Sequence, residues 1–179
     1  MTGSIAASAR RAVAVLTACI LAWGLAAPVA AGPTLPAASD LAASGRAIAR
    51  DGAPLVVLYS QHDCPWCDHA RTQLAPLARE PGIGARFAQI DLDSAAPLTD
   101  FAGRRTTHGA FARDEGIRFT PMLVIYGPSG ERLAEPVVGM GAVDFYGDRV
   151  MKAIDQARQR LEARHMHSAA RSAGRAPRS

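Results

Sequence analysis

The fold of this chain is decided by the stretch LVVLYSQHDCPWC, residues 55–67, in which an apolar run and a short polar turn precede a C-x-x-C pair. The run is rich in β-branched and large aliphatic residues, which is typical of a strand buried on both faces of a sheet. Pro65 suits the first turn of a helix, where its missing N–H removes no hydrogen bond. The stretch therefore predicts a buried strand, a turn and a helix that begins at the cysteine pair.

The cysteine pair predicts a redox site. Cys64 lies at the positive end of the predicted helix, where the helix dipole favours a thiolate over a thiol. Two cysteines separated by two residues can close a disulfide and reopen it by exchange with another thiol. The alternative is a purely structural disulfide between Cys64 and Cys67, but so short a loop removes little chain entropy. Redox exchange is the preferred interpretation.

Two motifs connect the chain to a known family. Cys64-Pro65-Trp66-Cys67 follows a hydrophobic strand, and Phe119-Thr120-Pro121-Met122 precedes another. In these motifs the chain resembles the thioredoxin superfamily over about Leu55 to Leu161, the length of one ordinary domain. Within the superfamily it most resembles bacterial periplasmic thioredoxin-related proteins, including the SoxW-like group. The marks of this subgroup are the long segment before Glu115 and the stretch Val138-Gly139.

The resemblance implies a role for individual residues. Cys64 is the expected nucleophile, and Cys67 is the thiol that resolves the mixed disulfide. The Thr120–Pro121 peptide bond is expected to be cis and to lie against the cysteine pair, whereas an ordinary trans proline at the start of an edge strand is the alternative. The residues expected to bind substrate are Trp66, Thr120, Pro121 and Gly139.

The fold class expected is α/β, with a thioredoxin-like fold. Strands alternate with helices and then close with a hairpin, which fits a central mixed β-sheet flanked by helices on both faces. Residues 93–116 exceed a normal connection, so we expect an insertion with structure of its own before the cis-proline strand. The first predicted elements are a helix capped by Ser39 or Asp40 and ending near Gly52, a strand from Leu55, and a helix from Pro65 to about Arg79 that Pro76 kinks or ends. They are followed by a strand from Arg86 to Leu92, a helix from Thr107 through Glu115, and a hairpin of Met122–Tyr126 with Arg132–Val138. The last predicted element is a helix capped by Asp144 with an apolar stripe of Tyr146, Val150, Ile154, Ala157 and Leu161.

The active-site stretch departs from ordinary thioredoxin in two ways. Leu58 occupies the position, six residues before the first cysteine, where cytosolic thioredoxin has a buried aspartate. The central dipeptide is Pro65-Trp66 rather than Gly-Pro, which is closer to glutaredoxins. Asp63 and Asp68 oppose a thiolate, while the helix end and any protonated neighbouring histidine favour it. We expect a moderately acidic thiol.

A metal site is a competing interpretation of the same residues. The pattern His62-x-Cys64-x-x-Cys67-x-His69 offers four potential ligands that zinc accepts. However, a cysteine on the second helical turn of this fold is expected to face inward, and His69 cannot easily converge with it. We therefore expect no metal and no cofactor, and the histidines are expected to tune the local charge.

The start of the chain has the parts of a secretory signal peptide, expected over residues 1–31. Arg10 and Arg11 form a basic region, residues 12–27 an apolar region, and Val29-Ala30-Ala31 a small-residue cleavage site. We expect cleavage after Ala31, with cleavage after Ala30 as the alternative. The paired arginines resemble a twin-arginine signal only weakly, which favours the general export route.

Export implies a periplasmic location. A minor alternative is lipoprotein anchoring at Cys19, because residues 16–19 resemble a lipobox, but an apolar run follows where a lipoprotein carries a polar tether. Without residues 1–31 the chain keeps two cysteines, Cys64 and Cys67, so no other thiol remains for a structural bridge in an oxidising compartment.

The remaining chain suits one domain with one core. We expect a linker and N-terminal helix over residues 32–52, a thioredoxin-like domain over 53–164 and a basic disordered tail over 165–179. Residues 156–179 carry six Arg and one Glu, a charge of +5, so the formal charge of +4 reflects mainly the end of the chain. The basic balance therefore does not indicate nucleic-acid binding.

Together these observations predict a periplasmic thiol–disulfide oxidoreductase that reduces or exchanges disulfides in exported proteins. Its expected partners are protein disulfide substrates and a membrane electron donor, because the periplasm has no reducing thiol pool. We expect a monomer. The alternatives are a DsbA-like disulfide oxidase and, from a different class, a non-catalytic metal- or peptide-binding module on the same fold.

Overall fold

The computed structural model describes residues 34–173 of the chain. The predicted signal peptide over residues 1–31, its cleavage site and the lipobox cysteine Cys19 lie outside the described residues. Among residues 34–173, no helix combines the length and the apolar character needed to cross a membrane.

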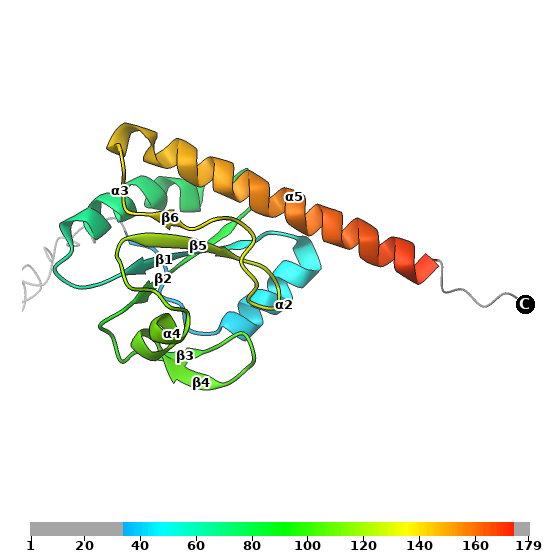
Figure 1. Cartoon of the computed structure of the whole chain (residues 1–179), viewed down its shortest axis with the longest axis horizontal. Helices are drawn as coiled ribbons and strands as arrows, with labels where there is room; N and C mark the ends of the chain where they lie inside the picture. The colour runs from blue at the N-terminus through cyan, green and yellow to red at the C-terminus, as the bar shows by residue number, and fades with distance from the viewer. Residues whose placement is uncertain (1–33, 174–179) are drawn as a thin grey trace, which may run out of the picture. The chain divides into compact units, whose positions relative to one another are not determined.

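A mixed four-stranded sheet forms the centre of the fold (Figure 1). Strand β1 (Leu55–Ser60) is buried along its whole length, as its apolar sequence predicts. It pairs in parallel with β2 (Arg86–Asp91) and antiparallel with β5 (Met122–Tyr126). The two-residue strand β6 (Val137–Val138) pairs antiparallel with β5 and completes the order β2-β1-β5-β6.

The register of the sheet decides which loops meet. Ser60 lies opposite Asp91 where the two parallel strands end, and Tyr59 lies opposite Met122 where β5 begins. Three segments therefore lie at the same end of the sheet: the turn after β1, the segment after β2 and the residues just before β5. The cysteine pair lies at this end.

Helices cover both faces of the sheet, which confirms the predicted thioredoxin-like architecture. Figure 1 shows α3 (Pro65–Arg79) and α5 (Tyr146–Ala173) on one side, and α2 (Leu41–Asp51) and α4 (His108–Asp114) on the other. The apolar stripe predicted for the last helix is buried against the sheet. It consists of Tyr146, Val150, Ile154, Ala157 and Leu161.

Local capping signals place the helix ends. The side chain of Asp40 accepts a hydrogen bond from the Ala43 N–H at 2.7 Å and begins α2, and Gly52 ends that helix with a φ of 72° that favours glycine. Thr107 caps α4 by accepting from the Ala110 N–H at 3.3 Å. Pro76 lies inside α3, which continues to Arg79.

Residues 93–116 hold structure of their own, as their length predicts. Strands β3 (Pro97–Thr99) and β4 (Arg105–Thr107) form a second, antiparallel sheet, and α4 follows directly. The buried carboxylate of Asp100 accepts main-chain hydrogen bonds from Ala102 at 2.9 Å and Arg104 at 2.8 Å in the turn between the strands. Burial opposes ionisation of Asp100, but the hydrogen bonds and the Arg104 guanidinium outweigh it and lower the pKa of this carboxyl.

Two predicted features near the end of the domain differ in the structure. The second hairpin strand does not run unbroken from Arg132 to Val138, because pairing with β5 is limited to one bridge at Arg132 and to the two residues of β6. Pro136, which has no N–H to donate to a ladder, lies just before β6. Asp144 lies inside a 3₁₀ turn (η1, Val143–Phe145) that precedes α5, instead of capping that helix.

The prediction of a disordered tail from residue 165 is wrong for most of its length. Helix α5 continues without a break to Ala173. The residues from 165 onward lack the apolar side chains of a core, but they are rich in alanine and arginine, which are strong helix formers. Once the packed part of α5 has formed, each further residue extends an existing helix and needs no new nucleus. Residues 174–179 lie outside the described part of the chain.

Candidate active site

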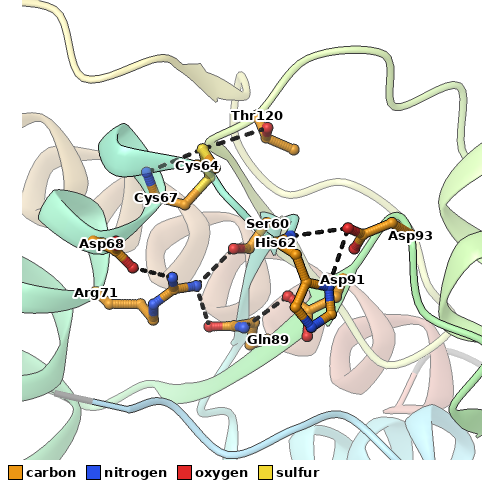
Figure 2. Close-up of a disulfide and its surroundings, with 10 residues drawn as sticks. All are labelled: Ser60, His62, Cys64, Cys67, Asp68, Arg71, Gln89, Asp91, Asp93 and Thr120. Atoms are coloured by element: carbon orange, nitrogen blue, oxygen red, sulfur yellow. Dashed lines mark hydrogen bonds and ion pairs between the residues drawn. A yellow bond between two sulfur atoms is a disulfide. The ribbon is translucent and has the colours of Figure 1, made fainter. Parts of the chain in front are cut away.

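Cys64 and Cys67 form a disulfide at the start of α3 (Figure 2). Cys64 is the N-cap residue of the helix, and its sulfur accepts a hydrogen bond from the Cys67 N–H at 3.2 Å. Cys64 is half-buried, whereas Cys67 is fully buried. The helix N-terminus and this N–H both favour negative charge on the Cys64 sulfur, so Cys64 is the thiol better placed to react with a partner.

The motif around Pro121 lies against the sulfur of Cys64. The Oγ1 atom of Thr120 is 3.8 Å from this sulfur (Figure 2), and the Thr120–Pro121 peptide bond is cis. The Gly139 N–H donates to the carbonyl of Pro121 at 2.9 Å, which joins the segment before β5 to the segment after β6. Two stretches that are distant in the sequence thus form one wall beside the disulfide.

The four residues expected to bind substrate line one open groove of about 230 Å³. Trp66 is 57% exposed at its rim. Phe119 and Val138, which adjoin Thr120 and Gly139 in the sequence, are also exposed large apolar side chains. The lining residues of the groove are Trp66, Thr120, Pro121, Gly139, Met140 and Gly141. The groove is mainly apolar and carries no charged side chain.

A second and more polar cavity of about 620 Å³ also borders Cys64. Its walls come from the turn after β1, the first turns of α3, the end of β2 and the segment before α2. The lining residues are Thr34, Leu35, Gln61, His62, Asp63, Cys64, Pro65, Asp68, Arg71, Gln89 and Asp91. Cys64 therefore lines the charged cavity, and its sulfur meets the apolar groove through Thr120, which lines that groove.

Arg71 is the centre of a hydrogen-bond network in the charged cavity (Figure 2). Its Nη1 donates to the Oγ of Ser60 at 2.7 Å and to the Oε1 of Gln89 at 3.4 Å. Its Nη2 forms an ion pair with Asp68. Gln89 in turn donates to the Oδ1 of Asp91 at 2.7 Å. The network joins α3 to the ends of β1 and β2 below the disulfide.

Arg71 and Ser60 belong to this site but are not predicted from the sequence. The signal that could have found Arg71 is its spacing, because Asp68 and Arg71 are an acidic and a basic residue at i and i+3 in the helix that follows Cys64. No comparable signal marks Ser60, whose partner comes from another element. Leu58, at the position of the thioredoxin aspartate, is fully buried in β1.

The two histidines near the cysteine pair have separate partners. The main-chain N–H of His62 donates to Asp93 Oδ2 at 2.9 Å, and its ring Nδ1 lies 3.1 Å from the same atom. Burial opposes ionisation of Asp93, but these contacts outweigh it and lower the pKa of the carboxyl. His69 packs against the ring of Trp66 with centroids 5.7 Å apart. Within residues 34–173 no three ligand-type side chains converge on a point that suits a metal ion.

Comparison with known proteins identifies the type of domain. A family model described as a thioredoxin-like domain matches residues 42–145. The comparison with curated proteins returned no match.

Several solved structures are similar to the chain. Mitochondrial thioredoxin 3 from Saccharomyces cerevisiae is 16% identical, with a TM-score of 0.45, and the match covers 66% of this chain and 93% of the yeast chain. Thioredoxin from Fasciola hepatica is 17% identical, with a TM-score of 0.48, over 69% of this chain and 99% of the other. A thioredoxin-fold protein from Helicobacter pylori is 12% identical, with a TM-score of 0.41, over 64% and 82% of the two chains.

Proposed function

Because the chain belongs to the thioredoxin-like domain family, we propose that it is a thiol–disulfide oxidoreductase that reduces or exchanges disulfides in exported proteins. The observation that carries the proposal is the disulfide at the start of α3, in which a half-buried Cys64 precedes a fully buried Cys67. A structural disulfide needs no such difference in access. A redox pair needs one thiol that reaches the substrate and one that stays behind it.

The reaction proceeds in two exchange steps. In the reduced protein, the Cys64 thiolate attacks one sulfur of a substrate disulfide, forms a mixed disulfide and releases the other substrate sulfur as a thiolate. The Cys67 thiolate then attacks the Cys64 sulfur and releases the second substrate thiolate. Two electrons pass from the protein dithiol to the substrate, and the Cys64–Cys67 disulfide is the oxidised product. The Cys67 N–H, 3.2 Å from the Cys64 sulfur, stabilises negative charge on that sulfur.

The groove beside Cys64 suits an extended segment of a protein substrate. Trp66 offers an exposed apolar surface, and Gly139 leaves the main chain open to close approach, because nothing lies within 4 Å of the place where its side chain would begin. Thr120 lies between this surface and the sulfur. A substrate cysteine can therefore reach Cys64 while its neighbours in the chain lie along the groove.

The proposed location and partners follow from the signal peptide predicted over residues 1–31. We place the protein in the periplasm, acting as a monomer on protein disulfides. Reduction there requires a membrane electron donor, because no reducing thiol pool is present. The chain supplies its own redox group, the cysteine pair, and the proposal includes no cofactor and no nucleic acid.

A pair of assays and a metal analysis test the proposal. The reduced protein is expected to accelerate insulin reduction by dithiothreitol, and the Cys64→Ser variant is expected to lose this acceleration. Faster oxidation of a reduced substrate protein than reduction of insulin would favour the DsbA-like oxidase. A stoichiometric metal ion with no exchange in either direction would replace the proposal by a binding module.

A further inference from the structure

The N-terminal part of α3 places three functional groups around one cavity. Asp68 and Arg71 are i, i+3 neighbours that form an ion pair on the helix, and Cys64 is the N-cap residue of the same helix. All three line the charged cavity of about 620 Å³. The Asp68 N–H also donates to the Cys64 carbonyl at 3.2 Å, so the first turn joins the two residues directly.

The other ionisable groups around Cys64 are mostly acidic. Asp63 precedes the cysteine, Asp68 lies one turn beyond it, and Asp91 lines the same cavity at the end of β2. His62 also lines the cavity, but it is paired with Asp93. The groove on the Thr120 side contributes no charged side chain. Carboxylates this close oppose a thiolate, so an unpaired Asp68 would make Cys64 less reactive at neutral pH.

Arg71 supplies the opposing charge, and the fold holds it in place. The ion pair with Asp68 joins a side chain that is 18% exposed to one that is 72% exposed. An ion pair with an exposed partner normally contributes little to stability, because holding a long arginine side chain in one conformation costs entropy. Here the guanidinium also donates to the fully buried Ser60 and to Gln89, on two different strands. These contacts keep the cation beside Asp68 and at the wall of the cavity.

We propose that Arg71 is a positioning residue for the redox reaction: it holds Asp68 and neutralises its carboxylate, so that a thiolate forms on Cys64 in the reduced protein. Arg71 acts through Asp68 and does not touch the substrate. The inference rests on the proposed thiol–disulfide exchange at Cys64. Leu58, at the position of the thioredoxin aspartate, is buried and carries no charge. The inference gives the network around Arg71 a role in adjusting the charge near Cys64, which Leu58 cannot have.

The test is the pH dependence of alkylation of the reduced protein by iodoacetamide, whose midpoint reports the pKa of the Cys64 thiol because Cys67 is buried. Arg71→Met removes the charge and keeps most of the aliphatic side chain. We expect its midpoint to rise and the thiolate fraction at neutral pH to fall by about 3- to 10-fold. In equilibrium with glutathione, the variant is expected to favour the disulfide by a similar factor, because its reduced form has lost thiolate stabilisation.

A double variant and a matched control make the test specific. Arg71→Met combined with Asp68→Asn is expected to return the midpoint toward that of the wild type, because the carboxylate that Arg71 neutralised is gone. Arg79→Met removes an exposed arginine from the last turn of the same helix and is expected to leave the midpoint unchanged.

The outcomes separate this inference from the proposed function. If Arg71→Met folds and keeps the wild-type midpoint, the inference is wrong, even where the melting temperature falls and insulin reduction persists. If Arg71→Met does not fold, Asp68→Asn alone decides, since Arg71 then faces no carboxylate and the midpoint is expected to fall. An unchanged or higher midpoint in Asp68→Asn contradicts the inference. If the wild-type protein itself shows no thiol–disulfide exchange activity, that result contradicts the proposed function instead.

Discussion

The Oγ1 atom of Thr120 lies 3.8 Å from the sulfur of Cys64, although 56 residues separate the two in the sequence. The contact follows from the sheet register, because Tyr59 near the end of β1 lies opposite Met122 at the start of β5. The loops at this end of the sheet carry the disulfide and the Thr120–Pro121 motif. The apolar groove that Thr120 lines is thereby adjacent to the sulfur of Cys64.

The different burial of the two cysteines predicts different trapping behaviour. Cys67→Ser is expected to accumulate mixed disulfides on Cys64, because the resolving thiol is absent. Cys64→Ser is expected to trap none, because Cys67 is fully buried. Non-reducing gels of both variants after incubation with an oxidised substrate protein give the measurement. Equal trapping by the two variants would show that the roles of the thiols are assigned wrongly.

The charges around the disulfide predict an intermediate redox potential. Leu58 places no carboxylate beneath the pair, and the acidic groups of the cavity are partly offset by Arg71 and by the helix N-terminus. We expect a potential of roughly −180 to −230 mV, between thioredoxin and the strong oxidants. Equilibration with glutathione buffers measures it. A value near the oxidising end, about −120 mV, would favour the oxidase alternative.

Truncation of the groove rim is expected to weaken substrate binding without unfolding the protein. Trp66 is 57% exposed, so Trp66→Ala removes little buried surface and is expected to change the free energy of unfolding by no more than about 0.5 kcal/mol. Tryptophans at interfaces often dominate binding, and we expect KM for a protein substrate to rise about 3- to 10-fold.

A matched control for the groove is Met166→Ala, which truncates a similarly exposed apolar side chain far along α5. It is expected to leave KM unchanged. Steady-state kinetics with a protein disulfide substrate compare the two variants, and equal KM values would remove Trp66 from the binding site.

Three buried tyrosines predict a loss of stability in alkali. Burial raises the pKa of Tyr146 to about 12, and it also raises the pKa values of Tyr59 and Tyr126, whose hydroxyl oxygens lie 2.6 Å apart. In the unfolded chain a tyrosine ionises near pH 10. The folded state then binds more protons than the unfolded state, so the stabilising contribution is complete below about pH 10 and is lost as the pH rises through the folded-state pKa.

Urea unfolding at a series of pH values measures this effect. Each tyrosine is expected to lower the free energy of unfolding by about 1.4 kcal/mol per pH unit between its unfolded-state and folded-state pKa values. Tyr146→Phe is expected to make the decline above pH 10 shallower by one such increment. A free energy of unfolding that stays constant up to pH 11 would contradict the prediction.

Much of the fold could be predicted from the sequence, because the signals concerned are local. The run from Leu55 predicts the buried strand, and Pro65 predicts the start of α3 at the cysteine pair. Asp40 and Thr107 act as caps because a short polar side chain needs only the N–H groups of the next turn. The motif around Thr120 indicates the family through resemblance, and this indication does not depend on the contact with Cys64.

Two predictions from the sequence are wrong, one for the end of the last helix and one for the second strand of the hairpin. The lack of apolar residues predicts a disordered tail, whereas α5 reaches Ala173 because helix propensity suffices to extend a helix that is already packed. The sequence predicts a second hairpin strand that is too long, because pairing with β5 is interrupted ahead of β6, where Pro136 has no N–H to donate.

The sequence by itself determined the redox pair, the helix that carries it and the order of the elements, since each of these depends on residues within a few positions of one another. Only the tertiary structure decided how the cation that shares the charged cavity with Cys64 is held. Arg71 contacts Ser60 and Gln89 because the parallel pairing of β1 with β2 brings the ends of both strands beneath α3. Sheet register depends on packing across the whole domain, so no local pattern of residues encodes that contact.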